Sequence, residues 1–237
     1  MNLLITICAR GGSKGIPGKN VKSLNGIPLM GYSIKHAQAF AKETQADIAL
    51  STEDDAIVAV AAEYGLQTDY RRPKELATDS AGKLPVIRDV VMDSEKNGKK
   101  YDLILDLDVT SPMRTLEDLR EATEMLMKNV NALNIFSVNP ARRHPSFNMV
   151  RLSADGFAEL IDRPTKQIES RQEAPKVFDL NASFYFYKRA FFDRDPLTLI
   201  DHSLLFEMQH PCFDLDEPVD FEFLEFLVKN KKLSFAI

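Results

Sequence analysis

The chain has 237 residues, of which 44% are hydrophobic and 27% charged, and its formal net charge is −5. A chain of this length buries roughly 70% of its unfolded surface, so it can fold without disulfides or a structural metal. The acidic balance argues against a general nucleic-acid-binding protein, which carries a basic excess. No apolar run approaches the roughly 20 residues of a membrane span, and the opening run, residues 3–7, is too short for a signal peptide. We therefore expect a cytoplasmic protein that binds neither nucleic acid nor membranes.

Strand and helix patterns alternate through the first 138 residues. Short apolar runs indicate strands, and longer runs with apolar residues every three or four positions indicate helices. This alternation predicts an α/β fold with a mostly parallel sheet and helices on both faces. The predicted strands cover residues 2–8, 46–52, 66–71, 101–108 and 131–138, and the predicted helices cover 30–43, 53–65, 83–98 and 115–129.

The alternation stops after Val138. Residues 139–180 carry prolines, charges and short apolar pieces, and the segment is too long for a plain loop in a compact domain. We interpret it as an inserted β-rich arm within one domain of residues 1–237, which covers the site or forms an oligomer contact. The pattern then predicts strands at 182–192 and 209–216 and a terminal helix at 217–232.

The loop after the first strand reads ARGGSKGIPGKN, residues 9–20. Ligands of open α/β sheets lie beyond the carboxyl ends of the strands, which is where this loop begins. Glycines let the backbone approach a ligand closely, and cations neutralise an anion, so the loop predicts a phosphate site. The glycines are Gly11, Gly12, Gly15 and Gly18, and the cations are Arg10, Lys14 and Lys19.

Two familiar phosphate loops do not fit this segment. A dinucleotide fingerprint needs the spacing G-x-G-x-x-G, whereas Gly12, Gly15 and Gly18 are evenly spaced with Pro17 between them. A Walker loop needs four residues before G-K-[ST], but five separate Gly12 from Gly18, and Asn20 stands where Ser or Thr is required. These mismatches argue against a dehydrogenase and a P-loop enzyme.

Five segments in order match the motifs of one family. They read ARGGSKGIPGKN (9–20), RRPKELATD (71–79), DVTSPMR (108–114), SRQEAPKVFDLNASFYFY (170–187) and FDLDEPVDFE (213–222). Together they resemble the acylneuraminate cytidylyltransferases, which include the CMP-sialic acid synthetases and their bacterial relatives. The resemblance implies a Rossmann-like nucleotidyltransferase fold and a homodimer built through the arm. It also implies an enzyme that takes CTP and a nine-carbon 2-keto sugar acid, releases pyrophosphate and makes a CMP-sugar.

The resemblance also implies roles for individual residues. Arg10 and Lys14 neutralise the leaving pyrophosphate, Asn20 and Arg72 recognise the base, and Arg171 binds the sugar carboxylate, which a guanidinium can grip bidentately. The residues expected to contact CTP or the sugar acid are Ala9, Gly11, Gly12, Ser13, Lys19, Asn20, Arg72, Asp108, Arg171, Gln172, Asn181 and Tyr185.

Asp214 and Asp216 form the candidate metal site. They lie two apart in a predicted strand, which places both carboxylates on one face. Two carboxylates on one face are costly unless a cation joins them, and Mg²⁺ prefers such oxygen ligands. Asp214 and Asp216 are therefore the expected magnesium ligands and, with Arg10 and Lys14, the expected catalytic residues.

The chain departs from the family motifs at several positions. Asp108 stands where the sialic-acid members carry Gln; we expect it to face the metal or the sugar, or to cap the turn before Pro112. Arg114 is either a structural residue or a contact for the sugar acid. Gly82 and Lys83 stand where small residues are expected, and Ala182 stands where the motif has Gly.

The sugar itself is left open by another departure. In the sialic-acid members a His-Pro pair is followed by a Lys near the sugar, whereas here His144 and Pro145 are followed by Phe147 at that place. Legionaminic, pseudaminic or deaminated nonulosonic acids are then as plausible as sialic acid. A CMP-Kdo synthetase is the alternative enzyme, although it lacks the TSPMR and RQEAPK type segments. A non-catalytic nucleotide-binding homologue is disfavoured because all four expected catalytic residues are present.

Overall fold

A six-stranded sheet forms the centre of the molecule in the computed structural model, which describes residues 1–13, 15–163, 174–195, 197–200 and 202–237. The strand order is β10-β6-β9-β5-β1-β4. β1 is parallel to β4 and β5, β10 is parallel to β6, and β9 is antiparallel to both β5 and β6. Five strands therefore run one way, which confirms the mostly parallel sheet. The strands are β1 (Leu3–Cys8), β4 (Asp47–Ser51), β5 (Leu103–Leu107), β6 (Asn134–Pro140), β9 (Phe178–Lys188) and β10 (Ser203–Glu207).

The five predicted helices all form, and side-chain caps mark the starts of α2 and α4, whereas α1 and α3 begin without one. The Asp54 side chain accepts hydrogen bonds from the first turn of α2, and Thr115 and Asp118 form a capping box at the start of α4. No helix in the described part of the chain is long and apolar enough to cross a membrane. The helices are α1 (Leu29–Thr44), α2 (Asp55–Glu63), α3 (Lys83–Ser94), α4 (Leu116–Lys128) and α5 (Pro218–Lys229), with short 3-10 turns η1 (Lys19–Val21), η2 (Lys74–Leu76) and η3 (Arg189–Asp193).

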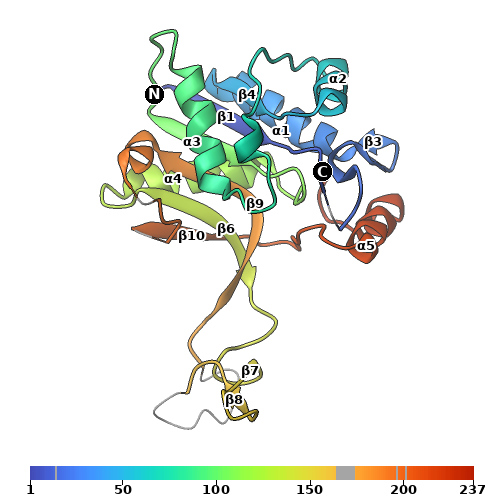
Figure 1. Cartoon of the computed structure of the whole chain (residues 1–237), viewed down its shortest axis with the longest axis vertical. Helices are drawn as coiled ribbons and strands as arrows, with labels where there is room; N and C mark the ends of the chain where they lie inside the picture. The colour runs from blue at the N-terminus through green and yellow to red at the C-terminus, as the bar shows by residue number, and fades with distance from the viewer. Residues whose placement is uncertain (14, 164–173, 196, 201) are drawn as a thin grey trace.

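Helices cover both faces of the sheet because the central strands alternate their side chains between two cores. Ile5 of β1 packs into the core that includes Phe40 of α1 and Leu119 of α4. Its neighbour Leu4 points the other way, into the core that includes Ile87 of α3. The arrangement in Figure 1 thus confirms the layered α/β fold expected from the sequence.

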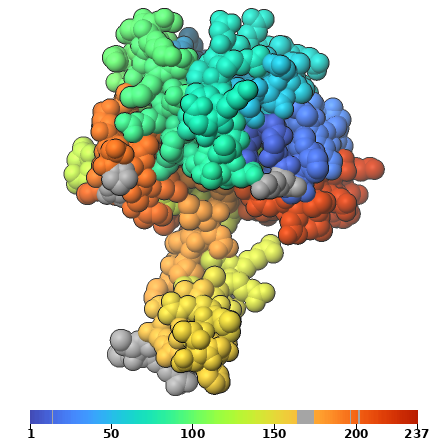
Figure 2. All heavy atoms as spheres, in the orientation of Figure 1, coloured from blue at the N-terminus to red at the C-terminus, as the bar shows by residue number. Residues whose placement is uncertain are grey.

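The segment between β6 and β9 leaves the body as an arm (Figures 1 and 2). Within it, β7 (Val150–Leu152) pairs antiparallel with β8 (Ala158–Leu160), and the chain returns through β9. A second small hairpin, β2 (Ser23–Leu24) with β3 (Ile27–Pro28), follows the glycine loop. The arm is β-structured as the sequence indicated, whereas its role in dimerisation stays a prediction.

Three predicted strands differ from the structure. Residues 66–71 form no strand. At the edge of β4 a side-chain hydroxyl takes the place of a backbone donor, since Thr68 Oγ1 donates to the Leu50 carbonyl (3.4 Å). Residues 209–216 also form no strand; an unpredicted one, β10, lies just before them, and Pro211 lacks the N–H that would extend its ladder. The aromatic strand predicted at 182–192 is β9, which starts earlier and gives way to η3.

Candidate active site

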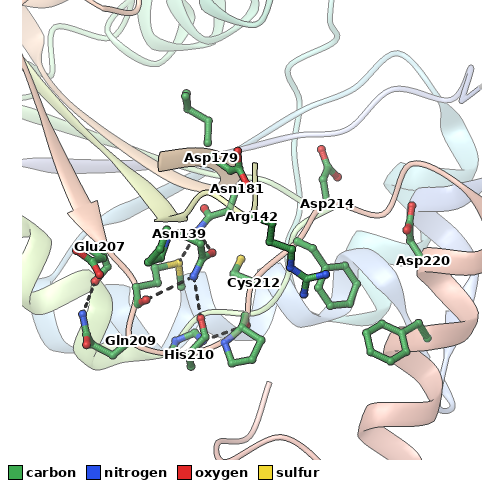
Figure 3. Close-up of a pocket in the computed structure, with 16 residues that line it drawn as sticks. Asn139, Arg142, Asp179, Asn181, Glu207, Gln209, His210, Cys212, Asp214 and Asp220 are labelled. Carbon is green, nitrogen blue, oxygen red and sulfur yellow. Dashed lines mark hydrogen bonds between the residues drawn. The ribbon is translucent and has the colours of Figure 1, made fainter. Parts of the chain in front are cut away.

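Two cavities lie at the edge of the sheet where the five parallel strands end. The smaller, about 380 Å³, lies beyond β1 and β5 and is lined by the glycine loop; we call it the loop cavity. The larger, about 820 Å³, lies beyond β6 and β10 (Figure 3). Residues 213–216 run between them, since Asp214 lines the larger cavity and Asp216 the loop cavity.

The glycine loop is shaped by close backbone approaches. A Cβ on Gly15 would lie 2.2 Å from the carbonyl oxygen of Asp216, so only glycine lets the loop approach this segment. The Gly11 N–H donates to Glu53 Oε1 (2.8 Å), whereas a Cβ on Gly12 would meet open space. Ser13 lines the loop cavity, and Ala9 is buried in the core, where its side chain contacts no ligand space.

Two of the loop cations have protein partners. Arg10 Nη1 donates to Asp79 Oδ1 at 2.6 Å, and both side chains are partly exposed at the cavity. Lys19 is buried and its Nζ donates to the Leu215 carbonyl at 2.5 Å, with Asp216 Oδ1 at 3.5 Å. Lys19 therefore ties the glycine loop to residues 215–216, and Arg10 stands at the mouth of the cavity.

Asn20 and Arg72, expected to recognise the base, both line the loop cavity and are buried. Asn20 Nδ2 donates to the Arg10 carbonyl (2.8 Å), while its buried Oδ1 has no hydrogen-bond partner among the described residues. Arg72 Nε and Nη2 donate to the side chain and carbonyl of Ser51 (3.0 and 2.7 Å). Asn20 thus offers a free acceptor, whereas Arg72 is held by the end of β4.

A charged cluster lies across the loop cavity from the glycine loop; Asp108 and Tyr185 in it were expected site residues, whereas Lys83 and Asp106 were not. Lys83 Nζ lies 2.6 Å from Asp108 Oδ2 and 3.0 Å from Asp106 Oδ2, and 4.3 Å from the centre of the Tyr185 ring. Burial lowers the pKa of Lys83, but Asp108 and Asp106 outweigh it, and the pKa lies well above its ordinary value. In the sequence, Lys83 and Asp108 stand out only as two separate departures from the family motifs, and nothing there shows that they pair.

The position of Asp108 settles what its carboxylate does in this state. Its Oδ1 accepts from the backbone N–H and hydroxyl of Thr110 (2.9 and 2.8 Å), and its Oδ2 accepts from Lys83. Of the roles expected for Asp108, capping the turn before Pro112 is therefore the one observed. Arg114 is fully buried and donates to the carbonyls of Asp108 and Ser111 (2.5 and 2.6 Å), so it is a structural residue.

Asp214 and Asp216 do not lie on a strand, so the expected single face for both carboxylates is wrong. They flank Leu215, whose N–H donates to the Thr110 carbonyl (2.9 Å). The Asp216 side chain is 76% exposed. Asp214 Oδ1 is buried without a hydrogen-bond partner among the described residues, and burial, followed by the charges of Asp108 and Asp216, raises the Asp214 pKa. Within the described part of the chain, no cluster of three or more His, Cys, Asp or Glu forms a metal site.

The larger cavity is organised around Asn181 (Figure 3). Asn181 Nδ2 donates to Asn139 Oδ1 (2.7 Å), and Asn139 Nδ2 donates to the His210 carbonyl (3.0 Å). This chain of amides fixes the wall contributed by β6 and β9. Further polar side chains on this cavity are Arg142, Asp179, Glu207, Gln209 and Asp220. Tyr185, expected with Asn181 at the sugar site, instead lies beneath Lys83.

Several predicted site residues are not placed at either cavity. Lys14, Arg171 and Gln172 lie outside the described residues. His144 is buried within the arm, where its Nε2 is 2.9 Å from the Pro175 carbonyl oxygen, and Phe147 is 43% exposed there. Phe147 lines neither cavity of its own chain, so its expected contact with the sugar stays a prediction.

Comparison with known proteins decides the family. Residues 4–232 match the family model described as cytidylyltransferase. The chain belongs to the cytidylyltransferase family. The recognition made from the five motifs is therefore confirmed, and the chain is a nucleotidyltransferase by family.

Individual relatives cover nearly the whole cytidylyltransferase chain. It is 37% identical over 233 residues to post-translational flagellin modification protein B of Campylobacter coli, covering 98% of this chain and 97% of the relative. It is 37% identical over 234 residues to CMP-N,N'-diacetyllegionaminic acid synthase of Campylobacter jejuni, with the same coverage. A solved structure of CMP:2-keto-3-deoxy-manno-octonic acid synthetase complexed with CTP superimposes with a TM-score of 0.67 at 15% identity, covering 98% of this chain and 100% of that one. This last similarity shows the shared fold, which is Rossmann-like as expected.

Proposed function

We propose that this cytidylyltransferase uses CTP to activate a nonulosonic acid, a nine-carbon 2-keto sugar acid, to its CMP derivative with release of pyrophosphate. The observation that carries the proposal is that two cavities share one wall, residues 213–216. The loop cavity offers glycines and cations for a triphosphate, and the larger cavity offers a polar lining for a sugar. A sugar hydroxyl in the larger cavity attacks the α-phosphorus at the end of that wall.

The loop cavity binds CTP in this proposal. Arg10, Lys14 and Lys19 neutralise the phosphates, and the loop backbone at Gly12, where a Cβ would meet open space, lets their oxygens approach closely. Asn20 and Arg72 read the cytosine, for which the unpartnered Asn20 Oδ1 is a suitable acceptor of the amino group. Fixed charges and dipoles of this kind supply most of the rate enhancement in phosphoryl-type transfer, because they stabilise charge on the leaving group.

The larger cavity takes the sugar acid, with Asn181 and the polar side chains around it contacting hydroxyl and acylamino groups. Arg171 binds the carboxylate and Gln172 a neighbouring oxygen. Among nonulosonic acids we propose a legionaminic-type substrate, because the 37% identical Campylobacter jejuni relative is a CMP-N,N'-diacetyllegionaminic acid synthase. Pseudaminic, sialic and deaminated nonulosonic acids are the alternatives that a substrate panel separates.

We propose Mg²⁺ as the cofactor, held by Asp214 and Asp216 together with the CTP phosphates. The residues fit the ion: Asp214 carries a buried carboxylate oxygen without a partner among the described residues, and Asp216 is exposed to the loop cavity. One or two carboxylates plus substrate phosphates form the usual protein site for Mg²⁺, so the site needs no larger cluster than the described residues contain. When bound, the ion supplies positive charge to the phosphates.

We also propose a cytoplasmic homodimer formed through the arm. Val150 and Leu152 on β7 and Phe157 in the turn before β8 expose 61%, 76% and 75% of their surface, respectively. Apolar side chains gathered on one element of a soluble protein mark an association surface. Light scattering with Leu152→Lys or Phe157→Lys tests this, since each change should convert a dimer to a monomer.

The decisive experiment for the function is a pyrophosphate-release assay with CTP and a panel of sugar acids. Release with nonulosonic acids supports the proposal, and a preference for legionaminic-type acids supports its finer form. Release with Kdo alone would favour the CMP-Kdo synthetase alternative. Binding of CTP without release with any acid would favour a non-catalytic nucleotide-binding homologue.

A further inference from the structure

The Lys83 ammonium is held in a fixed position at the loop cavity. It lies between Asp108 Oδ2 at 2.6 Å and Asp106 Oδ2 at 3.0 Å, with the Tyr185 ring 4.3 Å beneath it. Its side chain is 31% exposed, and Lys83 lines the loop cavity with Arg10 and Lys19. The remaining open side of the ammonium therefore faces the space that receives CTP in the proposed function.

The ammonium keeps donors for a ligand. A lysine ammonium carries three N–H donors. One of them makes a directed hydrogen bond to Asp108 Oδ2. Asp106 Oδ2 lies within ion-pair distance but receives no directed hydrogen bond from the described residues. Lys83 can therefore donate to a ligand oxygen without giving up its anchor on Asp108.

Lys83 also lies at the end of the loop cavity next to the shared wall. Asp108, which anchors it, bonds to Thr110, and the Thr110 carbonyl accepts from the N–H of Leu215 in that wall (2.9 Å). In the proposed reaction the phosphorus attacked by the sugar must lie at this wall, because the two cavities meet there. The α-phosphate is thus the phosphate that comes nearest to Lys83.

Resting on the proposed function, we propose that Lys83 binds the α-phosphate of CTP and that Asp106 and Asp108 position it. The acceptor sites of Asp108 are engaged by Thr110 and Lys83, so it acts through Lys83 rather than on the substrate. The proposal also explains why residues 83 and 108 depart together from the family motifs: they form one charge pair.

The test compares the binding of cytidine, CMP, CDP and CTP to the full chain, which NMR titration measures in the absence of sugar. Lys83→Met should weaken CMP, CDP and CTP by about tenfold or more, the effect of losing a charge-assisted hydrogen bond, and leave cytidine unchanged. Weakening of CDP and CTP alone, of cytidine as well, or of none of the four overturns the α-phosphate contact. The matched control is Lys96→Met, because Lys96 makes a 2.6 Å ion pair with Asp93 outside the cavity; it should bind all four as the wild type does.

A second variant guards against misfolding, because Lys83→Met leaves two carboxylates uncompensated. Lys83→Met with Asp108→Asn removes one charge of each sign, so the net charge of the Lys83, Asp106 and Asp108 cluster stays at −1. It should bind the three nucleotides no more weakly than Lys83→Met alone. Asp108→Asn by itself should weaken them less than Lys83→Met, and additive losses in the double variant would refute the positioning role. If the wild-type protein binds no CTP, both the proposed function and this inference are refuted. If the wild type binds CTP and Lys83→Met binds it equally well, only this inference is refuted.

Discussion

Gly15 and Asp216 approach each other so closely that a side-chain carbon on Gly15 would lie 2.2 Å from the Asp216 carbonyl oxygen. The contact joins the phosphate-binding loop to the segment that carries both proposed magnesium ligands. Lys19 strengthens the same junction through its bond to the Leu215 carbonyl. The loop and the carboxylates are therefore positioned by each other, although Gly15 and Asp216 lie 201 positions apart in the chain.

Gly15→Ala should separate these two segments. Backbone cannot yield cheaply to a Cβ, so we expect a loss of about 1–3 kcal/mol in the free energy of unfolding and weaker CTP binding. The control is Gly12→Ala in the same loop, where a Cβ meets no atom within 4 Å and stability should change by less than about 0.5 kcal/mol. Thermal unfolding of both variants checks this, and equal stabilities would show that the loop can shift without cost.

Arg10→Ala should lower turnover while the fold stays intact. Arg10 stands at the mouth of the loop cavity, partly exposed and paired with Asp79, so its loss removes a cation from the phosphates rather than from the core. By comparison with deleted transition-state donors we expect kcat to fall by about 10²-fold or more. Arg120→Ala is the matched control, because Arg120 pairs with Glu43 on the surface. Native circular dichroism with unchanged kcat for Arg10→Ala would contradict the phosphate role.

Activity should require a divalent cation. EDTA should abolish pyrophosphate release and Mg²⁺ should restore it, because Asp214 and Asp216 need a cation to offset their charge beside the triphosphate. Asp214→Asn and Asp216→Asn should each raise the Mg²⁺ concentration that gives half-maximal rate. Asp93→Asn serves as the control, since Asp93 pairs with Lys96 away from both cavities. Full activity in EDTA would eliminate the metal site.

The sequence predicted the layered fold because the pattern that specifies each helix or strand lies within one short stretch of chain. The helices carry periodic apolar faces, and α2 and α4 also carry side-chain caps, such as the capping box of Thr115 and Asp118. Segments 66–71 and 209–216 were predicted wrongly because their alternating patterns resemble strands, while their hydrogen bonds are decided by distant groups. Thr68, for example, bonds to the Leu50 carbonyl, which no local pattern reveals.

Only part of the candidate site could be predicted from the sequence, for the same reason. The glycine loop is contiguous, so its residues were found directly, whereas the Lys83–Asp108 pair joins the start of α3 to the end of β5. Each residue looked like an isolated departure from a motif until the fold brought them together. Likewise, the assumed strand placed Asp214 and Asp216 on one face, and the irregular segment directs them to two cavities.

The ion pair between His210 and Asp118 should make stability depend on pH. His210 Nε2 lies 2.9 Å from Asp118 Oδ2, and the His210 ring lies 4.0 Å from that of Phe235. Burial lowers the pKa of His210, but Asp118 outweighs it and the pKa is raised. The stabilisation is therefore fully present below the unfolded pKa of about 6.5 and is lost as pH rises through the folded pKa.

His210→Gln should accordingly lower Tm more at pH 5.5 than at pH 8.5. Asp118 is left in place because it also caps α4, so the variant removes the titrating partner alone. His36→Gln is the control: burial lowers the pKa of His36 to about 4, so this ring is neutral at both pH values and its Tm difference should not change between them. A Tm difference for His210→Gln that stays constant across this pH range would show that packing on Phe235, rather than the ion pair, carries the effect.

Ala182→Gly should stabilise the protein. Ala182 has φ +59°, in the left-handed region, at the point where the pairing of β6 with β9 shifts register. A residue with a Cβ is destabilised by about 1–2 kcal/mol in that conformation, and glycine removes this strain. Glycine also makes the unfolded chain more flexible, which lowers the free energy of unfolding by about 0.4–1 kcal/mol. We therefore expect a net gain of roughly 0.5–1 kcal/mol in the free energy of unfolding. Ala122→Gly in α4 is the control, and it should destabilise by about 1 kcal/mol because glycine weakens a helix. Urea unfolding of the two variants decides the matter: a loss of stability in both would mean that the bulge at Ala182 tolerates its side chain without strain.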